Sequence, residues 1–227
     1  MKDTLHDVNS YRSTTLNEIH KTSNGDPFNI LIATVLSSRS RDKNTSRVAK
    51  KLFARYKTPK TLSDADILEI EKIIKSIGFY HVKSKRIKKI AHIIHKQYNN
   101  KVPEKMEELI KLPGVGRKTA NCVLVYAFNK PAIPVDVHVH RISNRLGLIQ
   151  TKNVEETELE LMKEIPKRNW IKVNEIFVKY GQNVCLPISP LCKLCKLNHR
   201  CRYNNTHHER FVNINKSKTT QPIEPTR

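Results

Sequence analysis

Apolar side chains recur along most of this chain with the spacing of an α-helix, and no convincing pair of strands interrupts them. Residues at positions i, i+3, i+4 and i+7 lie on one face of a helix. Between residues 45 and 56 this face consists of Thr45, Val48, Ala49, Leu52, Phe53 and Tyr56. The same spacing predicts helices over residues 27–36, 45–56, 67–77, 82–98, 103–110, 117–128, 141–146, 154–164 and 170–180. The sequence therefore predicts an all-α fold.

Capping residues mark several of the expected helix ends. Asp26 directly before Pro27 is typical of a helix start, because the carboxylate accepts bonds from free N–H groups and proline fits the first turn. The other expected boundaries are a cap at Ser63 or Asp64, an end at Gly78 and a start at Pro103.

The chain is strongly basic, with 42 Lys and Arg against 21 Asp and Glu, a net charge of +21 and a pI near 9.9. The helix expected over residues 82–98 carries a basic side opposite its isoleucines, formed by Lys83, Lys85, Arg86, Lys88 and Lys89. A globular chain with such a charge is expected to bind a polyanion, nucleic acid first and an anionic membrane surface second.

The termini and the apolar runs bear on where the protein acts. The longest apolar run, Ile30–Leu36, is far too short for a bilayer, so no membrane span is expected. Residues 1–10 lack the apolar core of a signal peptide, which predicts an intracellular protein, in the cytoplasm and nucleoid or in the nucleus. Residues 211–227 are polar and contain two prolines, which predicts a disordered tail.

Four of the five cysteines crowd into 17 residues with the spacing C-x6-C-x2-C-x5-C: Cys185, Cys192, Cys195 and Cys201. In a chain that is not exported, this pattern indicates metal ligation and not disulfides. Four thiolates in one loop favour a 4Fe-4S cluster, and structural zinc is the alternative. Lys193 and Lys196 lie between the ligands, so a loop fixed by metal would present positive charge to phosphates. The remaining Cys122 is expected to be a small buried side chain.

Between two expected helices lies Leu112-Pro113-Gly114-Val115-Gly116, which is too rich in proline and glycine to be helical. Gly114 and Gly116 would let the backbone approach another molecule closely, and successive N–H groups at a helix start suit a phosphate. Arg117 adds charge beside this turn. The alternative is an ordinary tight turn between packed helices.

Lys118 and Asp136 are the candidate catalytic pair. Lys118 falls in the first turn of a helix, where the helix dipole and Arg117 both disfavour an ammonium, as an amine nucleophile requires. Asp136 interrupts an apolar stretch soon after that helix and could return to its start. Together they could attack an anomeric carbon and stabilise oxocarbenium character.

Plainer roles are available for both residues. Lys118 could be a surface lysine that binds phosphate, a role that its position alone favours. Asp136 could cap a helix beginning near His138, or Asp136, His138 and His140 could bind a metal. The metal site is disfavoured, because alternate residues share a face only in a strand.

Three stretches together resemble the endonuclease III family of helix-hairpin-helix DNA glycosylases: residues 112–121, residues 135–138 and the four spaced cysteines. The likeness covers about residues 20–205. It implies two lobes, a six-helix barrel over residues 21–132 that contains the hairpin (about 104–128), and a lobe of residues 1–20 and 133–210 that holds a 4Fe-4S cluster. It also implies excision of damaged pyrimidines from duplex DNA followed by strand cleavage, with Lys118 as the Schiff-base lysine and Asp136 as its carboxylate partner.

Two positions depart from the family pattern. Where the family often reads Leu-Ser-Ala-Gln, this chain has Leu36-Ser37-Ser38-Arg39, so Arg39 is expected to enter the space left by a flipped base. Phe79 stands where an aliphatic wedge is usual and is expected to stack on bases. The other DNA contacts expected are Leu112, Gly114, Gly116, Arg117, Lys193 and Lys196.

The partner implied is duplex DNA with damaged pyrimidines or abasic sites, bound by a monomer. Two other functions remain open at this point. One is a non-catalytic DNA-binding module with a zinc site, and the other is a glycosylase without lyase activity.

Overall fold

The computed structural model describes residues 18, 20–21, 25–38 and 42–206. Every regular element within these ranges is helical, which confirms the all-α prediction. Arg39 and the tail from residue 211 lie outside the described residues. None of the helices searched within the described ranges is both long enough and apolar enough to span a bilayer.

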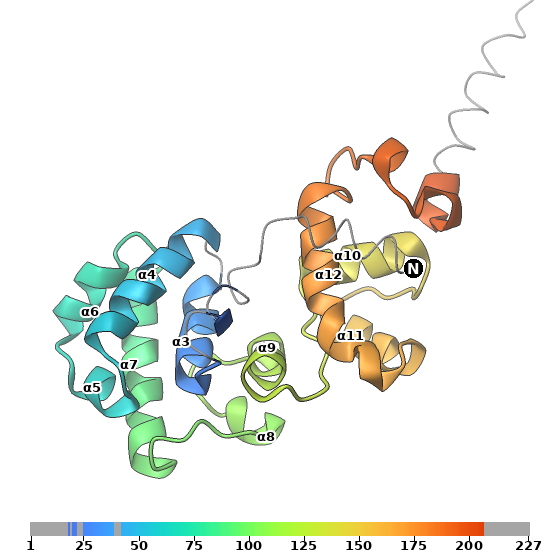
Figure 1. The fold of residues 1–227 in the computed structure, drawn as a ribbon. Coiled ribbons are helices and arrows are strands. Elements are labelled where there is room, and N and C mark those ends of the chain that lie inside the picture. The colour runs from blue at the N-terminus through green and yellow to red at the C-terminus, as the bar shows by residue number, and fades with distance from the viewer. Residues whose placement is uncertain (1–17, 19, 22–24, 39–41, 207–227) are drawn as a thin grey trace, which may run out of the picture.

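The first group of helices surrounds one large apolar core (Figure 1). Its members are α3 (Pro27–Ser37), α4 (Asp42–Arg55), α5 (Pro59–Asp64), α6 (Ile67–Ile74), α7 (Tyr80–Gln97), α8 (Met106–Leu109) and α9 (Arg117–Phe128). Helix α3 is buried along most of its length and contacts α4, α7 and α9. It is therefore the central helix of this group.

The second group follows residue 132 and has a much smaller interior. It comprises α10 (Val137–Leu146), α11 (Val154–Glu164), the short 3-10 helix η1 (Lys167–Asn169), α12 (Trp170–Asn183), η2 (Cys192–Leu194) and η3 (Asn198–Arg200). Helix α10 packs against α11 and α12, and two small apolar clusters fill the space between them. Helix α9 lies between the rest of the first group and this second group (Figure 1). The apolar clusters change at residue 132, while the lobe boundary placed there stays a prediction.

Several helix ends match their sequence signals. An Asp26 side-chain oxygen accepts a 2.8 Å bond from the Asn29 N–H, so the predicted cap of α3 is confirmed. Helices α9 and α11 have the predicted bounds.

Other helix ends differ from the predictions. Helix α6 is capped by Asp66, so the cap predicted at Ser63 or Asp64 is wrong. Those two residues instead end α5, a short helix that the apolar spacing missed because only Leu62 of its six residues is a large apolar side chain. Helix α6 ends at Ile74, before the predicted stop at Gly78, and α8 begins at Met106 and not at Pro103.

Helix α7 corrects one further expectation. The helical spacing predicts that Lys83 lies on the basic outer side of this helix, yet only 3% of the residue is exposed. Its Nζ donates to the backbone oxygens of Leu36 and Ser38, at 2.8 and 2.6 Å, where α3 ends. A long side chain can reach such acceptors while its ammonium stays hydrogen-bonded, so a helix-face pattern alone misplaces it.

Candidate active site

Asp136 begins α10 and uses one carboxylate oxygen to do so. Its Oδ1 accepts from the backbone N–H groups of His138 (2.9 Å) and Val139 (3.0 Å). This cap explains why α10 begins at Val137 and not near Arg141, as the apolar spacing predicted. The capping role considered for Asp136 is therefore confirmed.

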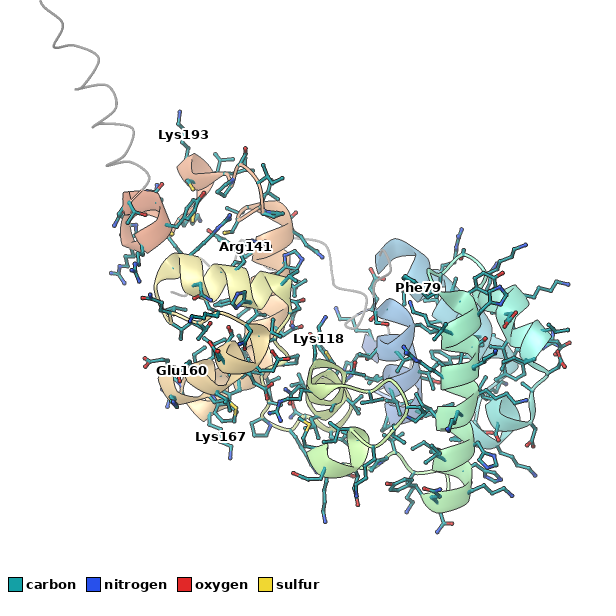
Figure 2. The ribbon with its side chains drawn as sticks, turned by 180° about the vertical axis from the view of Figure 1, so that it is seen from behind. Phe79, Lys118, Arg141, Glu160, Lys167 and Lys193 are labelled. Atoms are coloured by element: carbon teal, nitrogen blue, oxygen red, sulfur yellow. The ribbon has the colours of Figure 1, made fainter. Side chains whose placement is uncertain are left out.

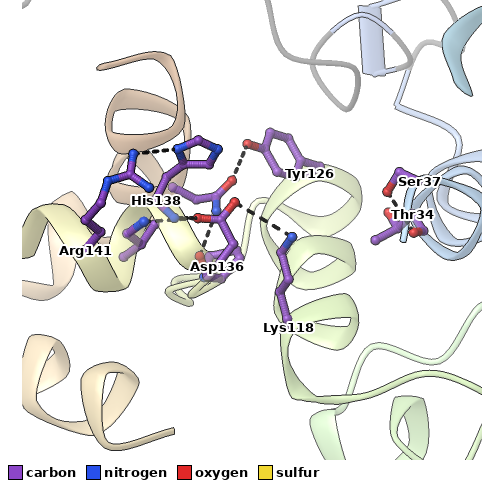
Figure 3. Close-up of polar contacts among 10 residues, drawn as sticks. Thr34, Ser37, Lys118, Tyr126, Asp136, His138 and Arg141 are labelled. Atoms are coloured by element: carbon purple, nitrogen blue, oxygen red, sulfur yellow. Dashed lines mark hydrogen bonds and ion pairs between the residues drawn. The ribbon is translucent and has the colours of Figure 1, made fainter. Parts of the chain in front are cut away.

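The second oxygen of Asp136 faces Lys118. Lys118 lies in the first turn of α9, and its Nζ is 3.8 Å from Asp136 Oδ2 (Figure 3). The Lys118 side chain is 55% exposed, whereas that of Asp136 is 15% exposed. An accessible amine thus lies beside a partly buried carboxylate, which is an arrangement suited to a nucleophile and a base.

The extended segment before Asp136 is held by amide side chains from two helices. Asn174 Nδ2 of α12 donates to the Pro134 oxygen at 2.7 Å. Tyr126 of α9 donates from its hydroxyl to Asn174 Oδ1 at 3.3 Å. Asn121 Nδ2, also from α9, donates to the Ile133 oxygen at 3.4 Å. The two helices thereby fix the backbone that carries Asp136.

His138 and His140 both lie inside α10 and make protein contacts. Arg141 donates to His138 Nδ1 at 3.1 Å, and His140 Nδ1 lies 2.7 Å from Thr157 Oγ1. Within the described residues, no three or more His, Cys, Asp or Glu side chains are arranged to hold a single metal ion.

Arg117, predicted to contact phosphate, binds a carboxylate of its own chain. Its Nε and one terminal nitrogen donate to the two oxygens of Glu158, at 3.2 and 2.7 Å. Hydrogen bonding to Glu158 is the main cause of a raised pKa for Arg117. The Glu158 side chain is only 7% exposed.

The turn between α8 and α9 contains two glycines with different surroundings. Gly114 has φ +78°, and a Cβ there would lie 2.8 Å from the Arg86 side chain. A Cβ on Gly116 would meet no heavy atom within 4 Å. The side chain of Leu112 is buried, so only its backbone could reach a ligand. Gly114 is thus required by the fold, and the open side of the turn lies at Gly116.

Phe79 lies at the start of α7 in the left-handed region, with φ +60° and ψ +32°. Its side chain is exposed, with 64% of the residue accessible (Figure 2). A bulky residue with positive φ is a strained exception, and such exceptions concentrate at binding sites. The exposure of Phe79 and its unusual backbone conformation both suit a residue that contacts a ligand.

The four spaced cysteines are free thiols, and within the described residues they do not form a group already arranged to hold a metal ion. Burial raises the pKa of the Cys192 thiol, and Cys195, Cys201 and Cys185 raise it further. Arg145 donates to Cys185 Sγ at 3.5 Å, and Tyr180 Oη lies 3.0 Å from Cys195 Sγ. By their chemistry, four soft sulfur donors at this spacing are the donor set of an iron–sulfur cluster.

Lys193 and Lys196, in the loop that contains the four cysteines, are both exposed, and Lys193 points outward from η2 (Figure 2). Burial raises the pKa of Cys122 to about 12, in agreement with its expected role as a buried side chain.

Sequence reasoning did not find Glu158, Asn174 or Arg145. Each is a polar residue on a helix, and the residue with which it forms a hydrogen bond lies about 40 positions away in the sequence. Helical spacing shows that such a residue is polar but not what it binds.

A model of the family described as HhH-GPD superfamily base excision DNA repair protein matches residues 32–167. Endonuclease III of Thermotoga maritima is 49% identical over 178 residues, covering 78% of this chain and 84% of that protein. Endonuclease III of Bacillus subtilis is 42% identical over 178 residues, with coverages of 78% and 81%.

Two solved structures are similar to this chain. The structure of a trapped endonuclease III–DNA covalent intermediate has a TM-score of 0.76 at 42% identity, covering 81% of this chain and 86% of that one. A thermostable thymine-DNA glycosylase has a TM-score of 0.73 at 25% identity, with coverages of 84% and 95%.

Proposed function

The chain belongs to the endonuclease III family of HhH-GPD base excision repair proteins and is a DNA glycosylase/AP lyase, and we propose that it removes oxidised or otherwise damaged pyrimidines through a Schiff base on Lys118. The observation that carries this proposal is the 3.8 Å separation between Lys118 Nζ and Asp136 Oδ2. At this distance an accessible amine lies next to a carboxylate, and imine formation at a sugar carbon requires both groups.

The protein binds damaged duplex DNA and turns the damaged base out of the stack, at a cost of a few kcal/mol that a weakened base pair lowers. The neutral amine of Lys118 attacks C1′ of the sugar, a C–N bond forms, and the base leaves with the electrons of the glycosidic bond. Asp136 Oδ2 accepts the proton from Lys118 or stabilises positive charge at C1′, while Oδ1 stays bound to the start of α10. The C1′–O4′ bond of the sugar ring then breaks, with O4′ taking up a proton as a hydroxyl, and the nitrogen lone pair forms the C=N bond of the imine. This imine makes a 2′ proton acidic. Loss of that proton expels the 3′ oxygen and cuts the strand on the 3′ side.

Cys185, Cys192, Cys195 and Cys201 are proposed to hold a 4Fe-4S cluster. The cluster would fix the loop that carries Lys193 and Lys196, whose charge attracts phosphates. No step of the base excision is assigned to it.

The remaining DNA contacts proposed are the backbone at Leu112, Gly114 and Gly116, base stacking by Phe79, and Arg39. The open side of the turn at Gly116 and the exposure of Phe79 support two of them. A chain with a net charge of +21 gains affinity by releasing counterions from the duplex.

The proposed lobes are the barrel of residues 21–132, with the hairpin over about 104–128, and the cluster lobe of residues 1–20 and 133–210. The change of apolar cluster at residue 132 supports this division. The protein is proposed to act as a monomer, on DNA inside the cell.

Borohydride trapping tests the assignment of Lys118. Borohydride reduces an imine to a stable amine, so the wild-type protein incubated with abasic duplex should become covalently linked to DNA. Lys118→Ala should give no adduct, and Lys118→Gln should bind DNA without cutting it. Lys111→Ala is the matched control, because Lys111 is an exposed lysine on the same hairpin.

An adduct formed by Lys118→Ala at the wild-type rate would remove Lys118 as the nucleophile. The cofactor is tested separately by iron and sulfide analysis and by the visible spectrum, since a zinc protein is colourless.

A further inference from the structure

Two of the ion pairs found among the described residues connect the first turn of α9 to the second group of helices. One is Lys118 with Asp136, and the other is Arg117 with Glu158. The first is loose, at 3.8 Å. The second is a bidentate contact in which both carboxylate oxygens of Glu158 accept from the guanidinium of Arg117, at 2.7 and 3.2 Å. Planar pairing of this kind fixes direction as well as distance.

Glu158 is in turn connected to the helix that begins at Asp136. Its neighbour Thr157 is buried, and Thr157 Oγ1 lies 2.7 Å from His140 Nδ1 of α10. Helices α10 and α11 also pack against each other. A chain of direct contacts therefore runs from Arg117 through α11 to α10, and Lys118 and Asp136 lie at its two ends.

The guanidinium of Arg117 cannot bind a DNA phosphate and keep both of its hydrogen bonds to Glu158. The Glu158 side chain is only 7% exposed, and removing the partner of such a buried carboxylate is strongly destabilising. If the guanidinium left for a DNA phosphate, a buried charge would remain unpaired. With Glu158 in place, the pair carries no net charge and attracts phosphate weakly.

We propose that Arg117 and Glu158 form a positioning pair that holds the start of α9 against α11, so that Lys118 meets Asp136, and that Arg117 does not bind a DNA phosphate. This inference rests on the proposed role of Lys118. It assigns to Arg117 a role inside the protein, in place of the DNA contact that its sequence position suggested.

The test compares variants on the two sides of the pair. Arg117→Met and Glu158→Gln each remove the pair, and the double variant shows whether the two effects share one cause. Arg117→Lys keeps the charge but loses the bidentate geometry, so it tests the idea in a protein that keeps an ion pair. Glu160→Gln is the control, because Glu160 lies on the same helix in an exposed pair with Lys163.

Two quantities are measured for each variant: the single-turnover rate of borohydride trapping on abasic duplex, and the affinity for a non-reactive abasic analogue at several salt concentrations. Misplacing reacting groups by about 1 Å can cost roughly a hundredfold in rate. We expect Arg117→Met and Glu158→Gln to slow trapping by similar factors, about ten- to a hundredfold, with no further loss in the double variant. Arg117→Lys should be slowed less, and Glu160→Gln should match wild type.

The salt dependence of binding separates the two roles of Arg117. A lost phosphate contact lowers the slope of log K against log salt by about 1. We expect an unchanged slope for Arg117→Met and for the double variant, because the guanidinium that they remove is already neutralised by Glu158 in the wild type. A lower slope for Arg117→Met, with trapping by Glu158→Gln at the wild-type rate, would overturn the inference.

The control experiments keep the two proposals apart. If Lys118→Ala still forms an adduct, the proposed function fails. If Lys118→Ala is inactive but Arg117→Lys and Glu158→Gln react as fast as wild type, only the positioning pair fails. Thermal melting of each variant identifies any that do not fold, and Arg117→Lys then decides alone.

Discussion

At the scale of single residues, Asp136 combines two roles that its two oxygens divide. Oδ1 accepts from two N–H groups at the start of α10, and Oδ2 faces Lys118. The capping role and the catalytic role considered from the sequence are therefore compatible in one side chain. The two roles require different properties of the side chain: the cap needs an acceptor oxygen, and the catalytic role needs a negative charge.

The substitution Asp136→Asn tests the two roles separately, because Asn keeps an acceptor oxygen and removes the negative charge. Asn is as good a helix cap as Asp, so Asp136→Asn should retain the free energy of unfolding, whereas Asp136→Ala should lose about 1 kcal/mol. Both variants lack the charge and should slow base excision by roughly a hundredfold or more. Urea titrations and single-turnover assays measure the two effects. A fast Asp136→Asn enzyme would show that the carboxylate charge is not needed.

The sequence was informative about this site where a residue's role depends on its neighbours along the chain. The start of α9 and the Pro-Gly turn before it were both predicted, and they place Lys118. The partners of Arg117 and Lys83 were not predicted, because each lies more than 40 residues away. Composition indicates that an arginine is positive but not whether DNA or Glu158 neutralises it.

At the scale of the helices, local spacing predicted the long elements and missed contacts between them. Helices α9 and α11 have the predicted bounds, although the buried positions of α11 include Thr157 and Glu158. Lys83 links α7 to α3, because its ammonium donates to the backbone oxygens of Leu36 and Ser38 where α3 ends. Burial, with a smaller effect of Arg86, lowers the pKa of Lys83 to about 8.

This lowered pKa of Lys83 should make stability depend on pH in the alkaline range. Between the folded pKa of about 8 and the ordinary value of 10.5, the unfolded chain binds more protons at Lys83 than the folded chain. The free energy of unfolding should therefore rise with pH in this window, by at most about 1.4 kcal/mol per pH unit. A neutral amine still has two N–H groups for the two carbonyl oxygens.

The comparison with Lys83→Met isolates this effect, because other titrating groups cancel in the difference. Wild type minus variant, measured by urea unfolding, should be larger at pH 9.5 than at pH 7.5. A constant difference would show that Lys83 titrates alike in the folded and unfolded states.

At the scale of the whole molecule, the two groups of helices differ in how they are stabilised. The first group shares one large apolar core that extends from Phe28 to Ala132. The second group has two small apolar clusters and the four cysteines. A small core often needs a metal site to be stable, and the energy of binding the metal is then energy of folding. The sequence revealed the cysteine spacing, but the difference in core size became visible only in the packed structure.

Loss of the proposed cluster should therefore affect one part of the molecule far more than the other. We expect Cys195→Ala to lose iron and to lose hydrogen-exchange protection over residues 137–206, with α3, α7 and α9 still protected. Cys122→Ala is the matched control, because Cys122 is buried in α9 within the large core and should leave the iron content unchanged. Exchange measured by mass spectrometry, with iron analysis on the same samples, distinguishes these outcomes. Uniform loss of protection across both groups would show that the cluster stabilises the molecule as a single unit, and retained protection in residues 137–206 would show that their small core suffices without it.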